Sequence, residues 1–439
     1  MIPTSRVSIA ALLALSLAAR AAPAAASASP SSPDTLAAVA DTLRFEPVER
    51  ARELAAREGE AYFGHGETWL RPPFGDHLLT DPDQWRSEGR RHTRTDLVVD
   101  YNRVDPLRLG LAWEGQIPGA LYPRLGARYA YATGRERGLY GVQIEQPLVA
   151  SGRYAIGASM VRVTDHNDLQ QVEDLENSLA LLFARTDYRD YFEREGYGAY
   201  LAWRVPDFST VSVHLRSDDY RTIPLYETTR SWFYMDRPLR PNPPIDEGTA
   251  RTATLRLERL AHRTRSMRAG LYHWIELEAA GGQLGGDFEY TRALADMRAI
   301  LRVSPATTLL LRGVGGHAAS GRIPVQKEFV TGGADGLRAH PIGQYRGDQM
   351  LLGQAEYVVG LWRLRSGGFE GGLHAVGFID AGRAWFNPGH EWDVGRQRFA
   401  ADAGFGLGTS EDNLRIYFAK NLQDPSSDLV MSVRLQRPF

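Results

Sequence analysis

Residues 197–205, YGAYLAWRV, alternate large apolar side chains with small or polar ones. Tyr197 and Leu201 fall on one parity, and Gly198 and Arg204 fall on the other. A period of two is typical of a β-strand, because successive side chains point to opposite faces of a sheet. The alternation recurs from about residue 96 to the end of the chain, most plainly in residues 107–114, 140–145, 211–216, 253–258, 267–277 and 414–418. The sequence therefore predicts an all-β protein.

Two architectures contain many alternating strands: a water-soluble sandwich and a transmembrane barrel. Sandwich strands usually span about 5–6 residues, whereas a tilted strand needs about 9–11 residues to cross a bilayer. The alternating runs here approach the greater length, and their polar parity is rich in glycine and charge, which suits a wet lumen. We therefore expect a transmembrane antiparallel β-barrel. About 345 residues at roughly 22 per strand and connection predict about 16 strands, although residues 170–189 and 222–248 fit the pattern poorly.

The N-terminus has the pattern of a secretory signal peptide. Arg6 precedes an apolar run over residues 7–19, and the small residues 21–26 offer several Ala-x-Ala cleavage sites. A single membrane anchor is the alternative, but the apolar run is too short for one. The predicted division is a signal peptide over residues 1–26, a periplasmic tether with one short helix (46–60) over residues 27–96, and the barrel over residues 97–439.

The composition excludes several classes of protein. The absence of cysteine rules out a disulfide scaffold, a thiolate zinc site and a cysteine nucleophile. The net charge of −2 lacks the basic character that drives nonspecific nucleic-acid binding. The 11 histidines form no His-Glu-x-x-His pair, and no Gly-x-Ser-x-Gly motif occurs. We therefore expect no enzyme activity, no catalytic residue, no metal, no cofactor and no nucleic-acid partner.

The C-terminal residues 428–439, DLVMSVRLQRPF, also alternate. The apolar parity includes Leu435 and Phe439, and Arg437 is the residue that interrupts it. A last strand of this kind resembles the terminal sorting signal of bacterial outer-membrane barrels, and we predict that role for Leu435 and Phe439. An ordinary closing strand is the competing interpretation.

One region departs from simple hairpins. Residues 331–345, TGGADGLRAHPIGQY, form a long glycine-rich connection with one arginine in its middle. Two predicted strands with distinctive residues follow it, at 354–358 (QAEYV) and 377–385 (GFIDAGRAW). If Ile379 takes the lipid side, Asp380 points into the lumen. An unpaired carboxylate there is costly, whereas an arginine–carboxylate pair is directional and often bidentate.

These motifs, in this order, resemble the BamA/TamA superfamily of outer-membrane assembly barrels, also called the bacterial surface antigen family. Members carry a long loop with a Gly-Gly start and a Val/Leu-Arg-Gly-Tyr/Phe tip. A strand glutamate and then a Phe-x-Asp-x-Gly strand follow that loop. The resemblance covers about residues 97–439 and is most specific over residues 330–439.

The loop tip matches this pattern in part. Leu337 and Arg338 occupy its first two positions. Ala339 and His340 stand where the family has glycine and an aromatic residue. The other matches are Glu356 for the strand glutamate and Phe378, Asp380 and Gly382 for the Phe-x-Asp-x-Gly strand. The resemblance implies that the loop folds into the lumen as a latch, with Arg338 against Asp380 and Glu356. The alternative leaves Arg338 as a solvated loop charge.

The resemblance implies a bacterial outer-membrane protein that inserts membrane proteins or translocates polypeptide. It would be a monomeric barrel surrounded by outer-membrane lipid, with unfolded outer-membrane or secreted proteins as clients. A weakly closed seam between the first and last strands would template incoming strands. The short stretch before the barrel predicts that complete POTRA domains are lacking. The alternatives are a passive channel or lipid-transport barrel, and an outer-membrane enzyme such as a lipase.

Overall fold

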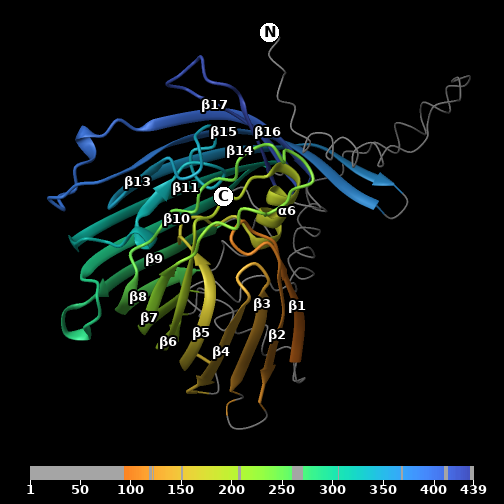
Figure 1. Ribbon diagram of the computed structural model, residues 1–439. Coiled ribbons are helices and arrows are strands. Elements are labelled where there is room, and N and C mark those ends of the chain that lie inside the picture. Colours follow the sequence, from red (N-terminus) through yellow and green to blue (C-terminus); the bar gives the residue numbers. More distant parts are fainter. Residues whose placement is uncertain are drawn as a thin grey trace, which may run out of the picture.

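The computed structural model describes residues 93–117, 121, 123–149, 152–205, 209–259, 270–304, 306–366, 369–409 and 414–435. Sixteen strands form one antiparallel sheet, and two short strands form a second sheet (Figure 1). The predicted signal peptide and the helix predicted over residues 46–60 lie outside the described residues.

The large sheet is a meander in which strands pair with their neighbours along the chain, with a detour through the small sheet between β11 and β14. Its strands are β1 (Thr93–Asp100), β2 (Arg108–Gln116), β3 (Arg124–Ala132), β4 (Arg137–Pro147), β5 (Tyr154–His166), β6 (Tyr191–Arg204), β7 (Ser209–Thr222), β8 (Gly248–Arg259), β9 (Gly270–Ala280), β10 (Tyr290–Ser304), β11 (Thr307–Gly321), β14 (Gln349–Ser366), β15 (Phe369–Trp385), β16 (Ala400–Thr409), β17 (Arg415–Asn421) and β18 (Val430–Arg434). The small sheet contains β12 (Phe329–Thr331) and β13 (Tyr345–Gly347). The helical elements are α6 (Asp174–Ala184) and the 3-10 turns η1 (Gly282–Leu284), η2 (Val325–Lys327) and η3 (Val394–Arg396).

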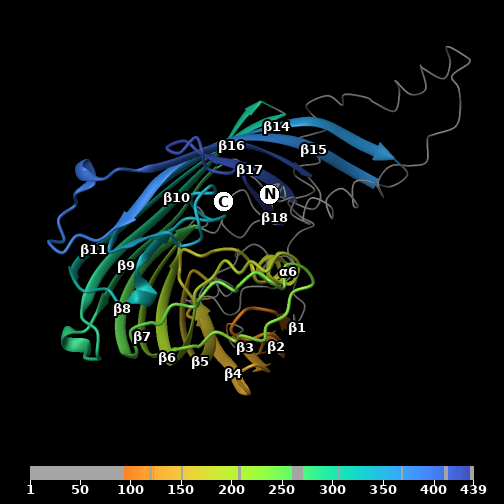
Figure 2. The same ribbon diagram turned by 45° about the horizontal axis from the view of Figure 1, so that its top comes forward.

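The two faces of the sheet differ sharply in polarity. On β6, Tyr197 and Leu201 are exposed, whereas Arg194 and Arg204 are buried. Figure 2 shows the sheet curling around α6 and several loops, so the buried charges line the inside of the curve. Apolar side chains outside and charged ones inside are the reverse of a water-soluble sheet and are typical of a barrel in lipid. The predicted fold class, a 16-stranded antiparallel barrel, is confirmed.

The structure differs from a closed cylinder at one seam. The strand order begins with β1 and ends with β18, and these two strands do not pair within the described residues. Both are short, with 8 and 5 residues respectively, so their edges carry few backbone groups for a ladder. Among the described residues, the seam therefore lacks the backbone hydrogen bonds that join the other neighbouring strands.

Two loop segments on the inside of the curve are built differently from hairpin turns. The segment between β5 and β6 contains α6, a helix that a period of two does not predict. The segment between β11 and β14 contains the small sheet and the loop between its strands. No helix within the described ranges is both long enough and apolar enough to cross a membrane.

Candidate functional site

The glycine-rich loop, residues 331–345, is folded back on itself. The amide of Gly333 donates to the carbonyl oxygens of Leu337 (3.0 Å) and His340 (3.1 Å). Gly332 has a φ of 117°, and a Cβ at this position would lie 2.3 Å from the carbonyl oxygen of Pro341. Glycine is therefore required there for the two arms of the loop to approach each other.

Arg338, at the tip of this loop, is buried between two wall carboxylates. Its Nη1 lies 2.7 Å from Glu356 Oε1 on β14, and its Nε lies 3.2 Å from Asp380 Oδ2 on β15. The guanidinium carbon also lies 4.2 Å from the ring centroid of Phe378 and 4.7 Å from that of Tyr417. Two carboxylates and two aromatic faces together replace the water that a buried guanidinium loses.

The charges around Arg338 are balanced by further partners. Arg415 Nη1 lies 3.0 Å from Glu356 Oε2, so two arginines face the two carboxylates. Gln354 Nε2 donates to Asp380 Oδ1 at 3.1 Å. Burial acts to lower the pKa of Arg338, but Asp380 and Glu356 raise it above its ordinary value. Arg338 is therefore held in its charged form inside the barrel.

The two tip positions that depart from the family pattern contact the next strand along the sheet. Ala339 donates its amide to Asp402 Oδ2 on β16 at 2.8 Å. His340 Nδ1 lies 2.9 Å from Asp402 Oδ1, and its ring centroid lies 5.5 Å from that of Tyr345. The histidine thus keeps a ring at the aromatic position and adds a polar contact to β16. The loop tip consequently touches β14, β15 and β16 in succession.

Arg434 on β18 joins the other arm of the loop to the last strand of the sheet. Its Nη1 donates to the carbonyl oxygen of Ala334 at 2.8 Å and lies 3.1 Å from Asp335 Oδ1. Its Nε lies 2.7 Å from Glu176 Oε1 on α6. Arg434 is not among the site residues predicted from the sequence, although a charged residue on the lumen-facing parity of an alternating strand was a usable signal.

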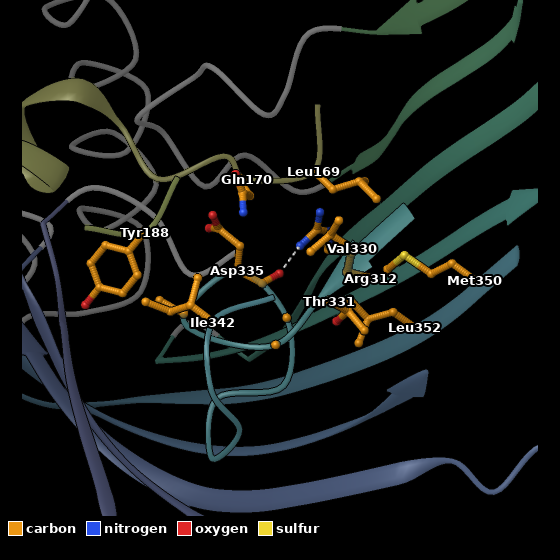
Figure 3. A pocket seen from close by; sticks show the side chains of 13 residues that line it. Leu169, Gln170, Tyr188, Arg312, Val330, Thr331, Asp335, Ile342, Met350 and Leu352 are labelled. Atoms are coloured by element: carbon orange, nitrogen blue, oxygen red, sulfur yellow. Dashed lines mark hydrogen bonds between the residues drawn. The ribbon is translucent and has the colours of Figure 1, made fainter. Parts of the chain in front are cut away.

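Asp335 also connects the loop to the chain that precedes α6. Its Oδ2 accepts a hydrogen bond from the amide of Val172 at 2.7 Å, and its carbonyl oxygen accepts one from Arg312 Nη1 at 3.0 Å. Figure 3 shows Gln170 above Asp335, Ile342 below it and Tyr188 further to the left, with Arg312 to the right. The cavity between them has a volume of about 20 Å³, enough for a water molecule but not for a larger ligand.

Charged residues on β9 and β10 contact both loop segments, the one that contains α6 and the one that contains the glycine-rich loop. Arg292 on β10 contacts Asp168 (2.5 Å), Glu276 (3.1 Å) and Glu278 (3.1 Å). Lys327 lies 3.4 Å from Glu278 and 3.5 Å from Asp168. Asp168 precedes α6 and Lys327 precedes the glycine-rich loop, so one cluster of charges anchors both segments. In the described part of the chain, no group of three or more His, Cys, Asp or Glu could hold a metal ion.

The structure thus places four of the predicted site residues in contact: Arg338, Glu356, Phe378 and Asp380. Gly382 packs closely against β14. A Cβ at Gly382 would lie 2.8 Å from both the carbonyl oxygen and a methyl group of the neighbouring strand β14, so its role is close strand packing. Leu435 donates its amide to α6, and Phe439 lies outside the described residues.

An apolar exterior, a charged interior and a loop held inside by buried ion pairs define a barrel of the outer-membrane type. The family model described as the Omp85 superfamily domain matches residues 255–434. The matched residues include the glycine-rich loop and β14 to β18, and the match confirms the resemblance to the BamA/TamA superfamily.

Three solved structures are similar to this chain. BamA from Haemophilus ducreyi lacking POTRA domains 1–3 matches with a TM-score of 0.54 and 14% identity, over 79% of this chain and 69% of that chain. CdiB from Acinetobacter baumannii (TM-score 0.40, 14% identity) and CdiB from Escherichia coli (0.45, 12%) each match over 79% of this chain and over 60% and 62% of their own lengths. The likeness to BamA shows a shared fold. No curated protein matches the chain.

Proposed function

We propose that this protein is a bacterial outer-membrane barrel that inserts membrane proteins or translocates polypeptide. At the level of the family, the Omp85 match supports such an activity, and barrels of that family are outer-membrane proteins. The observation that carries the proposal is the seam. In the described part of the chain, β1 and β18 end the sheet without pairing to each other.

An unpaired strand edge is a template for another strand, because its free N–H and C=O groups seek partners. On β1, Leu97 and Val99 are exposed on the lipid-facing side. An unfolded outer-membrane protein has the same period of two, so its strand could pair with this edge and place its own apolar side chains in lipid. The seam therefore suits a client that is itself a β-strand.

We call the glycine-rich loop (residues 331–345) the latch. It would keep the lumen closed while a client strand pairs at the seam. Its tip ties β14, β15 and β16 together through Arg338 and Asp402, so that this part of the wall is rigid. A lumen filled by the latch and α6 disfavours a passive channel. The same proposal includes the predicted signal peptide (1–26), the tether (27–96) and a monomeric barrel in outer-membrane lipid.

The test is client insertion into liposomes that contain the full-length mature chain. Because the protein has no cysteine, a pair such as Val99→Cys and Met431→Cys can be joined across the seam by a bismaleimide. A urea-denatured eight-stranded outer-membrane barrel serves as the client. We expect faster insertion with the uncrosslinked chain than with empty liposomes, and a return to the empty-liposome rate after crosslinking.

Insertion no faster than with empty liposomes would contradict the insertion activity. Equal rates before and after crosslinking would show that the seam is not the route. Stable, large currents in planar bilayers would instead favour the passive channel.

A further inference from the structure

Helix α6 lies at the seam and contacts the end of the first strand. Ser178 donates its hydroxyl to Asp100 Oδ1 at 2.9 Å, and its Oγ accepts the amide of Tyr101 at 3.0 Å. Asp100 is the last residue of β1 and is buried. Asp100 also pairs with Arg108 at the start of β2, so the contact reaches the first hairpin of the sheet. Both views show α6 beside β1 on the inside of the curve (Figures 1 and 2).

The same turn of α6 contacts the last strand. Glu176 Oε1 lies 2.7 Å from Arg434 Nε, and Glu176 Oε2 accepts the amide of Leu435 at 3.2 Å. Arg434 is the last residue of β18 that pairs with β17, and Leu435 follows it. The N–H of Leu435 therefore bonds to a side chain of α6. Glu176 is 3% exposed, so this contact takes place away from water.

The helix is itself firmly placed. Asn177 Nδ2 donates to Asp187 Oδ1 (3.1 Å) and to Tyr191 Oη (2.9 Å) at the start of β6. At its C-terminus, Arg185 adopts a left-handed conformation with a φ of 51°, and its amide bonds back to Leu181 at 3.1 Å. Trp232 of the next loop donates its amide to Leu182 at 2.7 Å. A helix fixed in this way can transmit restraint from one strand edge to the other.

We propose that α6 is a seam strap: Ser178 binds the β1 edge, Glu176 binds the β18 edge, and together they hold the seam shut until a client displaces them. The strap joins the two strand edges where the described residues form no β1–β18 ladder, and it occupies a backbone donor, the Leu435 amide, that an added strand would use. Its role in regulating insertion rests on the proposed function, whereas its role in closing the seam does not.

Arg434 also makes the strap and the latch interdependent. The same guanidinium binds Glu176, the carbonyl oxygen of Ala334 and Asp335. Displacing α6 removes Glu176 as a partner of Arg434. Of the three contacts, Arg434 then keeps the two with the latch, to Ala334 and Asp335. Opening the seam therefore also disturbs the loop that closes the lumen.

The closing role is tested by hydrogen exchange of the full chain in nanodiscs. Glu176→Ala removes both contacts to β18, whereas Glu176→Gln retains an acceptor for the Leu435 amide. Ser178→Ala removes the contacts to β1, and Ser178→Thr restores the hydroxyl. We expect exchange at Leu435 and in β1 to accelerate about tenfold or more in the two alanine variants, and much less in the Gln and Thr variants.

Glu258→Gln is the matched control, because Glu258 is also a 3% exposed lumen carboxylate but lies on β8, away from the seam. It should leave exchange at the seam unchanged. Amides of β10 and β11 report whether a variant is folded. Unchanged exchange at both seam edges in folded Glu176→Ala and Ser178→Ala chains would overturn the strap.

The regulatory role is tested with the liposome assay and the same variants. Strap release should raise the rate of client insertion severalfold, and Ser178→Thr should return it to that of the native chain. If the native chain inserts clients and the released variants are no faster, α6 does not regulate insertion. If no variant inserts clients but exchange at the seam accelerates, the proposed function fails and the closing role of the strap stands.

Discussion

Arg338 shows how a single side chain can fix a loop inside a barrel. It lies against Glu356 and Asp380 and against the rings of Phe378 and Tyr417, and its side chain is 2% exposed. Removing one partner of such a buried pair typically costs about 3–5 kcal/mol, since it leaves a buried charge without its counterion; here Asp380 would lose Arg338, whereas Glu356 would keep Arg415. The closed position of the latch therefore depends strongly on this residue.

We expect Arg338→Ala to leave the barrel assembled but to increase its leakiness to large antibiotics. Two buried carboxylates would then face each other without their shared cation, and the latch would leave the lumen. Sensitivity of cells to a glycopeptide antibiotic, at matched protein levels, measures the effect. Arg338→Lys keeps the charge but loses the planar fork and should be intermediate. Normal permeability at normal protein levels would count against the latch.

Asp190 provides a residue whose effect depends on pH. It accepts hydrogen bonds from Arg103 Nη2 at 3.1 Å and Arg240 Nη1 at 2.5 Å, and it pairs with Arg346. Burial acts to raise its pKa, but Arg240, Arg346 and Arg103 lower the pKa of Asp190 below its ordinary value of 3.8. A lowered pKa in the folded state adds stability that is present above the ordinary pKa and is lost as the pH falls through the lowered one.

Asp190→Asn should therefore lower the thermal unfolding midpoint at about pH 7, where the native carboxylate is ionised. The difference between the two proteins should shrink as the pH falls well below about 4. Thermal unfolding in nanodiscs over this pH range measures it. A difference that is constant with pH would show that the carboxylate charge is not what holds these loops together.

At the scale of elements, the latch needs backbone shapes that other residues adopt poorly. Gly332 combines a positive φ with a close approach to Pro341. Gly313 on β11 has no atom within 4 Å of the position of a Cβ. The two glycines therefore provide a strained site and an open site in the same molecule.

Gly332→Ala should destabilise the closed latch by about 1–3 kcal/mol, because the new Cβ meets a carbonyl oxygen and the backbone is strained. Hydrogen exchange of residues 333–344 should accelerate accordingly. Gly313→Ala should leave these amides unchanged. Equal exchange in both variants would mean that the latch backbone tolerates a side chain at Gly332.

At the scale of the whole molecule, the outer face of the sheet faces lipid in the proposed function. Leu201 on β6 is 52% exposed, and Leu422, in the loop between β17 and β18, is 50% exposed. The two leucines are equally accessible but differ in position along the strand axis. Substituting the same residue at both positions therefore distinguishes the effect of lipid contact on stability from the effect of side-chain exposure.

We expect Leu201→Arg to destabilise the barrel by about 2–4 kcal/mol in phospholipid vesicles, because the charge enters the hydrocarbon region. Leu422→Arg should change stability by less than about 0.5 kcal/mol, as is usual for a surface site. Reversible guanidinium unfolding in vesicles measures both. Equal stability of the two variants, or a chain that stays dispersed without detergent, would contradict the membrane placement.

Strands and their facing could be predicted from the sequence because they depend on local periodicity. The strand predicted over residues 377–385 lies within β15, and Ile379 lies outside while Asp380 lies inside. The loop arginine and the two acidic strands were identified through the resemblance of their motifs to a known family, and the cost of an unpaired carboxylate in a barrel wall supported that match. These inferences require no knowledge of which distant segments meet.

The alternating strands and the apolar exterior could be predicted from periodicity, and the residues around Arg338 from the resemblance of their motifs to a known family. The contacts of α6, the three partners of Arg434 and the lack of β1–β18 pairing within the described residues became visible only in the folded chain. Glu176 and Leu435 are 259 positions apart and meet only because the sheet curls through 16 strands. No local pattern encodes such a meeting, since it depends on the summed curvature of every strand between the two residues.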